Sequence, residues 1–211
     1  MEGTRSIALK ICGNRDNITE VASLNPDYMG FIFYEPSPRY VGVGFKMPTD
    51  LPKSVKKVGV FVNEEVEVIK RIATDLKLDF VQLHGSEPVA DCQTLKRFGV
   101  GVIKVFSIDT TFDFDTTMLY EGAADFFLFD TKGKFYGGNA IPFDWNLLAY
   151  YHQRVPFFLG GGLSLENIFA VNNLSTMNLH AIDVNSGVED SPGLKNIVKT
   201  KFMLEILNSK F

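Results

Sequence analysis

Short runs of Val, Ile, Leu and Phe recur along the chain, and most are apolar at successive positions instead of alternating with polar residues. Strands that are apolar on both faces are typical of a parallel sheet whose outer side is covered by helices. The runs predict eight strands, at residues 7–12, 28–33, 57–62, 80–84, 101–106, 125–130, 155–160 and 181–186.

Apolar residues at helical spacing occupy several of the intervening segments. They predict helices over residues 63–72, 88–98, 165–171 and 194–207. Asn63 and Ser164 are the expected N-caps of the first and third of these. The last helix is expected to bury one stripe, formed by Ile197, Val198, Met203, Leu204 and Leu207. The segments after the second and sixth strands carry weaker helical patterns.

Predicted strand starts recur about every 21 to 30 residues, the length of one βα unit, and eight such units close into a (β/α)8 barrel. The sequence therefore predicts an α/β fold, a (β/α)8 TIM barrel, as a single domain over residues 1–211. A doubly wound open sheet is the alternative. That fold rarely needs eight units and usually has a Gly-rich turn after its first strand, where this chain has Cys12-Gly13-Asn14-Arg15.

The amino-acid composition of the chain argues against several classes of binding partner. The 211 residues include 21 Lys+Arg and 25 Asp+Glu, a net charge of −4 without a dense basic run, which argues against nucleic acid. No apolar stretch reaches about 18 residues and the N-terminal run is too short for a signal-peptide core, so we expect a cytoplasmic protein with no membrane partner. Two distant cysteines and three scattered histidines predict neither a disulfide framework nor a metal site.

In a barrel of this kind the C-terminal ends of all strands open at one mouth, so polar residues there converge however distant they are in sequence. Six of the eight predicted ends carry chemical groups: Cys12, Arg39, His84, Asp130, Gly160 to Gly162, and Asp183 to Gly187. The mouth is therefore the expected site.

Glycines at two adjacent strand ends suit a phosphate held by backbone N–H groups. Gly160-Gly161-Gly162 precedes a predicted helix, and Ser186-Gly187 follows the next strand. The triple glycine alone is equally consistent with a tight turn, but its pairing with Ser186-Gly187 favours a phosphate site.

Cys12 is a candidate reactive group if it faces the mouth, although a lone cysteine in a strand is more often a small buried hydrophobe. Lys10 would then lie two residues below it on the same face, where a cation lowers a thiol pKa. Lys10 would serve equally well to neutralise an interior carboxylate such as Asp183, and both roles stay open. Cys92 is interpreted as structural.

Three further side chains have two interpretations each. Asp130 follows an apolar run that favours its neutral, acid form, or it caps a helix or forms a salt bridge. Arg39 lies in a Pro-stiffened loop and is suited to bidentate carboxylate recognition, or it is a surface charge. His84 either caps a strand end or contributes to the site.

Taken together, these segments resemble the phosphoribosylanthranilate isomerase family of tryptophan biosynthesis over nearly the whole chain. The matching stretches are Lys10-Ile11-Cys12-Gly13, Gly30-Phe31-Ile32-Phe33, Ser37-Pro38-Arg39-Tyr40, Val58-Gly59-Val60-Phe61-Val62, Val81-Gln82-Leu83-His84-Gly85, Leu128-Phe129-Asp130-Thr131, Phe143-Asp144-Trp145, Leu159-Gly160-Gly161-Gly162-Leu163, and Asp183-Val184-Asn185-Ser186-Gly187-Val188-Glu189 with Ser191-Pro192-Gly193. Each is weak alone, and their order and spacing are highly specific.

The resemblance implies a (β/α)8 barrel that performs the Amadori rearrangement of N-(5-phosphoribosyl)anthranilate to 1-(2-carboxyphenylamino)-1-deoxyribulose 5-phosphate without a cofactor. It implies Asp130 as general acid and Cys12 as general base. It further implies an anthranilate-carboxylate site at Arg39, with Asp183 near the ribose hydroxyls and His84 near the mouth. The implied 5-phosphate site comprises Gly161, Gly162, Ser186 and Gly187. In one departure, Asn139-Ala140-Ile141-Pro142 replaces the family's usual Thr-Gly, so an altered loop after the sixth strand is expected.

Two other functions compete with this one. The isomerase of histidine biosynthesis is a related barrel, but its bisphosphorylated substrate needs a second phosphate site and its chemistry relies on paired aspartates, whereas the first strand here offers Cys12. A non-catalytic barrel that binds a phosphorylated metabolite or a protein would be free to lose Cys12 or Asp130, and both are present. The sequence does not decide between a monomer and a homodimer.

Overall fold

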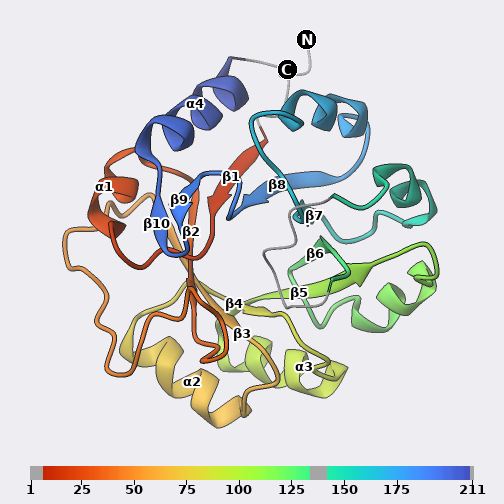
Figure 1. The fold of residues 1–211 in the computed structure, drawn as a ribbon. Helices are drawn as coiled ribbons and strands as arrows, with labels where there is room; N and C mark the ends of the chain where they lie inside the picture. The colour runs from red at the N-terminus through yellow and green to blue at the C-terminus, as the bar shows by residue number, and fades with distance from the viewer. Residues whose placement is uncertain (1–6, 134–141, 210–211) are drawn as a thin grey trace.

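The computed structural model describes residues 7–133 and 142–209. Within them, eight parallel strands form a closed barrel in chain order, with β1 paired to both β2 and β8 (Figure 1). The predicted (β/α)8 fold is therefore confirmed, with a strand in every predicted run. The strands are β1 (Ala8–Ile11), β2 (Tyr28–Ile32), β3 (Lys56–Phe61), β4 (Phe80–Leu83), β5 (Gly101–Ile108), β6 (Phe126–Thr131), β7 (Phe157–Leu159) and β8 (Leu179–Val184).

The helices surround the barrel (Figure 1), and both α-helices and 3₁₀ helices are present among the described residues. The α-helices are α1 (Ile18–Ser23), α2 (Val66–Asp75), α3 (Val89–Phe98) and α4 (Ile197–Asn208). Between β5 and β8 the connections use 3₁₀ helices instead: η1 (Phe114–Tyr120), η2 (Trp145–Tyr150) and η3 (Ile168–Leu174). None of the helices in the described ranges is long and apolar enough to span a membrane.

Two predicted N-caps are wrong. Asn63 has a positive φ of 51° and lies before the helix, whose N-cap position is occupied by Glu65. The Asn63 side chain instead accepts a hydrogen bond from Ser86 N at 2.7 Å. The N-cap position of η3 is occupied by Asn167 and not by Ser164. The Asn167 amide accepts from Ser164 N at 3.0 Å and donates to Gly162 O at 2.8 Å, which fixes the turn before the helix can start.

The C-terminal helix also begins later than predicted. Leu194–Lys195 forms a strand, β10, that pairs antiparallel with β9 (Glu189–Ser191), and α4 starts at Ile197, where Asn196 accepts from Lys199 N at 2.8 Å. Val198 is 78% exposed and does not belong to the buried stripe. At 3.6 residues per turn it points away from the side that buries Met203 and Leu207.

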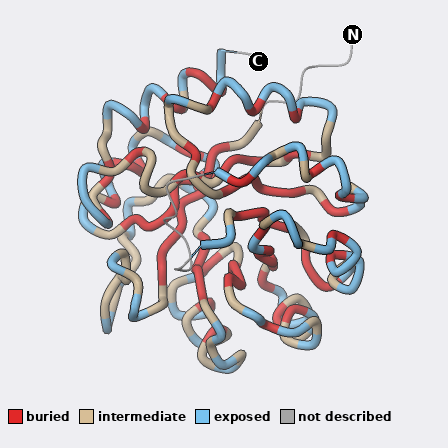
Figure 2. The backbone as a smooth tube through the Cα atoms, turned by 45° about the vertical axis from the view of Figure 1, so that its right-hand side comes forward, coloured by how far each residue is buried: buried red, intermediate tan, exposed pale blue. Residues whose placement is uncertain are grey.

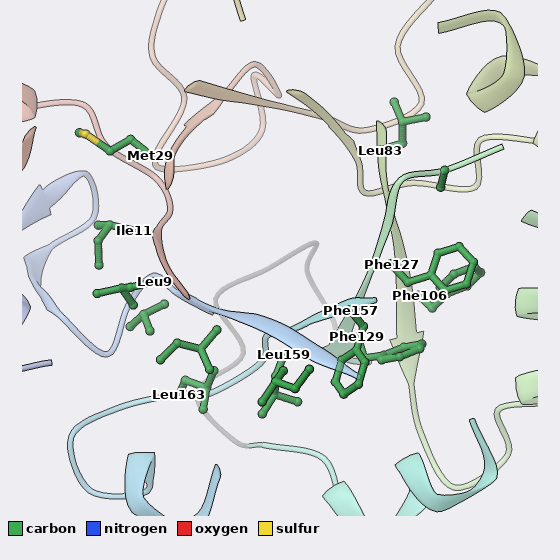
Figure 3. Packing of buried hydrophobic residues seen from close by; sticks show 14 of the residues in the cluster. Leu9, Ile11, Met29, Leu83, Phe106, Phe127, Phe129, Phe157, Leu159 and Leu163 are labelled. Carbon is green, nitrogen blue, oxygen red and sulfur yellow. The ribbon is translucent and has the colours of Figure 1, made fainter. Parts of the chain in front are cut away.

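Alternation along the strands separates an outer apolar layer from the barrel interior. On β6, Phe127 and Phe129 pack outward in the large cluster under the helices, whereas Leu128 belongs to a smaller cluster inside. Figure 3 shows the outer layer, with Phe106, Phe127, Phe129 and Phe157 grouped beside β5 to β7. Buried backbone follows the strands and exposed backbone follows the surrounding helices and loops (Figure 2). The interior face therefore ends, at the C-terminal mouth, in the polar residues of the candidate site.

Candidate active site

A pocket opens at the C-terminal ends of the strands and brings together residues from across the sequence. Eight of the nine predicted site residues line it: Cys12, Arg39, His84, Asp130, Gly161, Gly162, Asp183 and Ser186. The ninth, Gly187, follows Ser186 directly and forms a β-bridge with Ser164. The convergence that the sequence predicted is therefore present in the structure.

Cys12 follows β1 and is buried, with 4% of its surface exposed, while still lining the pocket. Its backbone N donates to Val184 O at 2.8 Å, which fixes it to the end of β8. On the other side lies Gly30 of β2, where a Cβ atom would come within 2.8 Å of the Cys12 sulfur. Glycine at position 30 therefore provides the room that the thiol occupies.

Lys10 lies beneath the pocket, inside the barrel, and is fully buried. Its Nζ donates to Gln82 Oε1 at 2.7 Å and to Asp183 Oδ2 at 2.8 Å. Burial lowers the pKa of Lys10, but the nearby Asp183 and Cys12 raise it by more, so the ammonium form is favoured. The interior ion pair with Asp183, one of the two roles left open for Lys10, is thus present.

The second possible role of Lys10 was to activate the Cys12 thiol by lowering its pKa, and the unliganded site does not show this lowering. Burial raises the pKa of Cys12 and Asp183 raises it further, while Lys10 and Lys195 lower it; the net pKa lies above the ordinary 9.0. The expectation that Lys10 leaves this thiol with a lowered pKa is therefore wrong. Loss of hydration disfavours the thiolate by more than one buried cation stabilises it.

Titration of the unliganded protein checks this direction. Since a raised pKa favours the protonated form, we expect the thiolate ultraviolet absorbance of Cys12 to reach half of its maximum only above pH 9.0. The difference between wild type and Cys12→Ser isolates the signal, because burial also raises the pKa of Cys92, to about 11. Thiolate absorbance from Cys12 already present at neutral pH would contradict the result.

Asp130 ends the interior face of β6 and lies beside His84 of the β4 end. Asp130 Oδ2 is 3.2 Å from His84 Nε2, and Asp130 Oδ1 accepts from Thr131 N at 2.8 Å. Both side chains are about 9% exposed and both line the pocket. Asp130 thus has a close polar contact with His84, which is an ion pair only when the imidazole is protonated, and it also faces the space where a ligand would sit. His84 therefore lies at the pocket together with Asp130.

A second buried ion pair supports the turn that follows His84. Lys104 Nζ contacts Glu87 Oε2 at 2.7 Å, with 3% and 1% of the two side chains exposed. Glu87 also accepts from Gly85 N at 2.9 Å and from Asn63 N at 2.9 Å. These contacts fix the backbone next to His84. Sequence reasoning missed them because neither residue stands at a strand end facing the mouth.

The two glycine turns lie against one another. Gly161 has a φ of +81°, and a Cβ there would come within 2.5 Å of Thr131 N, so only glycine fits. A Cβ on Gly187 would overlap the carbonyl of Leu163. The turns after β7 and β8 therefore offer closely spaced backbone at the pocket, an arrangement suited to binding a phosphate.

Arg39 lines the pocket, but its bidentate carboxylate partner is within the protein. Arg39 Nε lies 3.0 Å from both oxygens of Glu189, and Arg39 Nη2 donates to Glu189 Oε2 at 2.7 Å. The sequence offered no signal for this pairing, since Glu189 matched a family segment without an assigned role.

Across residues 7–133 and 142–209, no group of three or more His, Cys, Asp or Glu side chains is arranged to hold a metal ion. The expected alteration at Asn139-Ala140-Ile141 lies outside the described residues.

Comparison with known proteins agrees with this geometry. A family model described as N-(5'-phosphoribosyl)anthranilate (PRA) isomerase matches residues 9–205. The isomerase of that name from Parabacteroides distasonis is 46% identical over 95% of this chain and 93% of its own. The Thermotoga maritima phosphoribosyl anthranilate isomerase structure is 32% identical, with a TM-score of 0.83 over 96% of this chain and 99% of its own. Another such structure, 31% identical with a TM-score of 0.79 and coverages of 96% and 99%, holds reduced 1-(o-carboxyphenylamino)-1-deoxyribulose 5-phosphate.

Proposed function

The chain belongs to the N-(5'-phosphoribosyl)anthranilate isomerase family, and from this premise we propose which of its residues carry each step of the reaction. The enzyme isomerises N-(5-phosphoribosyl)anthranilate, an aminoaldose, to the corresponding aminoketose in tryptophan biosynthesis. One arrangement supports the residue assignment above all: Cys12 and Asp130 line the same pocket as the two glycine turns.

Asp130 is the general acid that opens the sugar ring. Its carboxyl group donates a proton to the furanose ring oxygen as the C1–O bond breaks, and the anthranilate nitrogen lone pair forms the C=N bond of an iminium ion. The contacts of Asp130 with His84 and with Thr131 N hold the carboxyl group toward the pocket. A fixed donor lowers the barrier because it needs little reorganisation in the transition state.

Cys12 is the general base for the second step. Its thiolate removes the proton on C2, the C–H electrons form the C1=C2 bond, and the iminium electrons return to nitrogen to give an enolamine. Protonation at C1 and loss of the hydroxyl proton from O2 then give the ketone. At that point Asp130 has given up one proton and Cys12 has gained one, and transfer of one proton from the Cys12 thiol to the Asp130 carboxylate, directly or through solvent, restores both groups.

Substrate binding stabilises the thiolate form of Cys12, which the unliganded site disfavours. Among the described residues, no donor reaches the buried Asp183 Oδ1, and Asp183 lines the pocket. Ribose hydroxyls that donate to this oxygen offset part of the negative charge that raises the Cys12 pKa. The iminium cation next to the thiol favours the thiolate further. Cys12 is therefore activated by the bound intermediate more than by the empty site.

The ends of the substrate fix its direction in the pocket. Gly161, Gly162, Ser186 and Gly187 bind the 5-phosphate through backbone N–H groups and the Ser186 hydroxyl. Arg39 binds the anthranilate carboxylate with the guanidinium edge that Glu189 leaves open. With both ends held, C2 lies toward Cys12 and the ring oxygen toward Asp130.

Anthranilate fluorescence tests the activity directly. Phosphoribosylanthranilate, generated in situ, is added to the purified protein without metal or cofactor, and its fluorescence is followed. We expect rapid loss of signal that depends on enzyme concentration. No loss, together with no binding of the reduced product analogue, would overturn the assignment of substrate.

A further inference from the structure

Glu189 stands directly behind Arg39 without lining the pocket itself. It accepts hydrogen bonds from Arg39 Nε and Nη2, and only 5% of its side chain is exposed. Of the five N–H groups of a guanidinium, these contacts use those on one edge. Within the described part of the chain, no hydrogen bond from Arg39 Nη1 is found. One edge of the guanidinium is thus fixed to the protein, and the other is left for a ligand.

Glu189 is itself held rigidly. Lys195 Nζ donates to Glu189 Oε1 at 2.7 Å and to Asn185 Oδ1 at 2.9 Å, and Lys195 is 1% exposed. Gly193 N donates to the same Glu189 oxygen at 3.2 Å. Burial raises the pKa of Glu189, but Arg39 and Lys195 lower it by more, so its carboxylate stays ionised at neutral pH. Glu189 is therefore a fixed anion on the β9–β10 hairpin.

The position of Glu189 in the chain connects the two ends of the pocket. It follows Ser186-Gly187 by two residues, whereas Arg39 lies 150 residues away, in the loop after β2. Among the described residues, the hydrogen bonds of the Arg39 guanidinium are all with Glu189. Glu189 therefore fixes the position of the Arg39 guanidinium relative to the turn after β8.

We propose that Glu189 is a positioning residue that holds Arg39 at a set place relative to the Ser186-Gly187 turn, and so makes the enzyme select substrates carrying both a phosphate and a carboxylate. This rests on the proposed roles of Arg39 and of the phosphate turn. A guanidinium without Glu189 loses the charge-assisted hydrogen bonds of Nε and Nη2 and regains rotamer freedom, which weakens its binding of a carboxylate. Phosphate binding, which uses separate backbone groups, is unaffected.

Two ligands that differ by one group test this inference. One is reduced 1-(o-carboxyphenylamino)-1-deoxyribulose 5-phosphate, and the other is its phenylamino counterpart without the carboxylate. Calorimetric Kd values give a ratio, the carboxylate preference, that we expect to be on the order of 10- to 100-fold in the wild type. In Glu189→Gln, whose amide offers one acceptor oxygen, the preference falls roughly tenfold. KM rises by a similar factor, kcat stays within about threefold, and inhibition by inorganic phosphate is unchanged.

Arg15→Ala is the matched control, because Arg15 joins the same two segments without touching the pocket. Its Nη1 donates to Pro38 O at 2.7 Å and its Nη2 to Pro192 O at 2.8 Å. We expect this variant to keep the carboxylate preference. If it loses as much preference as Glu189→Gln, the effect is that of a loosened loop and the inference is overturned.

Arg39→Ala separates the inference from the function it rests on. This variant should abolish most of the carboxylate preference; if it keeps the preference, the assigned role of Arg39 is wrong and that of Glu189 with it. Loss in Arg39→Ala but retention in Glu189→Gln overturns the inference alone. If the Glu189→Gln variant fails to fold, Glu189→Asp replaces it in the test. This variant keeps a negative charge near Lys195, but its side chain is too short to contact both Nε and Nη2 of Arg39. It too should lose the preference.

Discussion

We expect replacement of Asp130 by Asn to lower kcat about 10³-fold, because the carboxamide is isosteric but has no acidic proton to give to the ring oxygen. KM and the Kd of the reduced product analogue change little, since Asp130 acts on a bond that breaks only in the reaction. Steady-state fluorescence assays give kcat and KM, and calorimetry gives the Kd. The fold is retained, because Asn keeps the acceptor oxygen that Thr131 N contacts in the wild type.

Asp75→Asn is the control for loss of a carboxylate, since Asp75 is an exposed residue at the end of α2. It should retain wild-type kinetics. Wild-type turnover in Asp130→Asn would remove Asp130 from the chemistry. A large rise in KM with kcat intact would instead make it a binding residue.

The second large effect is expected at Cys12. Cys12→Ser should lower kcat by about 10² to 10⁴, because a serine hydroxyl is ionised far less readily than a thiol and cannot remove the C2 proton. Substrate deuterated at C2 sharpens the assignment: the kinetic isotope effect on kcat should increase in Cys12→Ser, where proton removal becomes limiting, and should not increase in Asp130→Asn. The two variants are thereby assigned to different steps.

Cys92→Ala controls for removal of a thiol. Cys92 lies fully buried on α3, away from the pocket lining, so this variant should keep kcat while losing some stability. An isotope effect that is equal in Cys12→Ser and wild type, with kcat unchanged, would show that another group is the base.

The strands and the convergence at the mouth could be predicted because they depend on patterns within single segments. Runs that are apolar on both faces mark strands of a covered barrel, and the residue that follows each run is delivered to the same end. Cys12, His84 and Asp130 were located in this way. The buried side of α4 was harder to predict from the sequence. The β9–β10 hairpin and the Asn196 cap decide where the helix begins and therefore which side of it is buried, and Val198 lies on the exposed side.

What escaped prediction depends on contacts between distant segments. The partner of Arg39 is 150 residues away, and no local pattern relates the two positions. The direction of the Cys12 pKa shift depends on how completely Gly30 and the surrounding strands exclude water from the sulfur, which a sequence does not express. Charge near a thiol can be read from spacing, whereas its desolvation cannot.

The barrel closes where β1 meets β8, and this seam aligns Lys10 with Asp183, residues 173 positions apart. Contacts of such long sequence separation carry a large loop-closure entropy and are expected to form late in folding. Lys10 lies on β1 and Cys12 follows that strand, whereas Asp183 lies on β8 and the Ser186-Gly187 turn follows it. We therefore expect activity to appear during refolding only when the ring closes, and a partial barrel with most of its strands in place to be inactive.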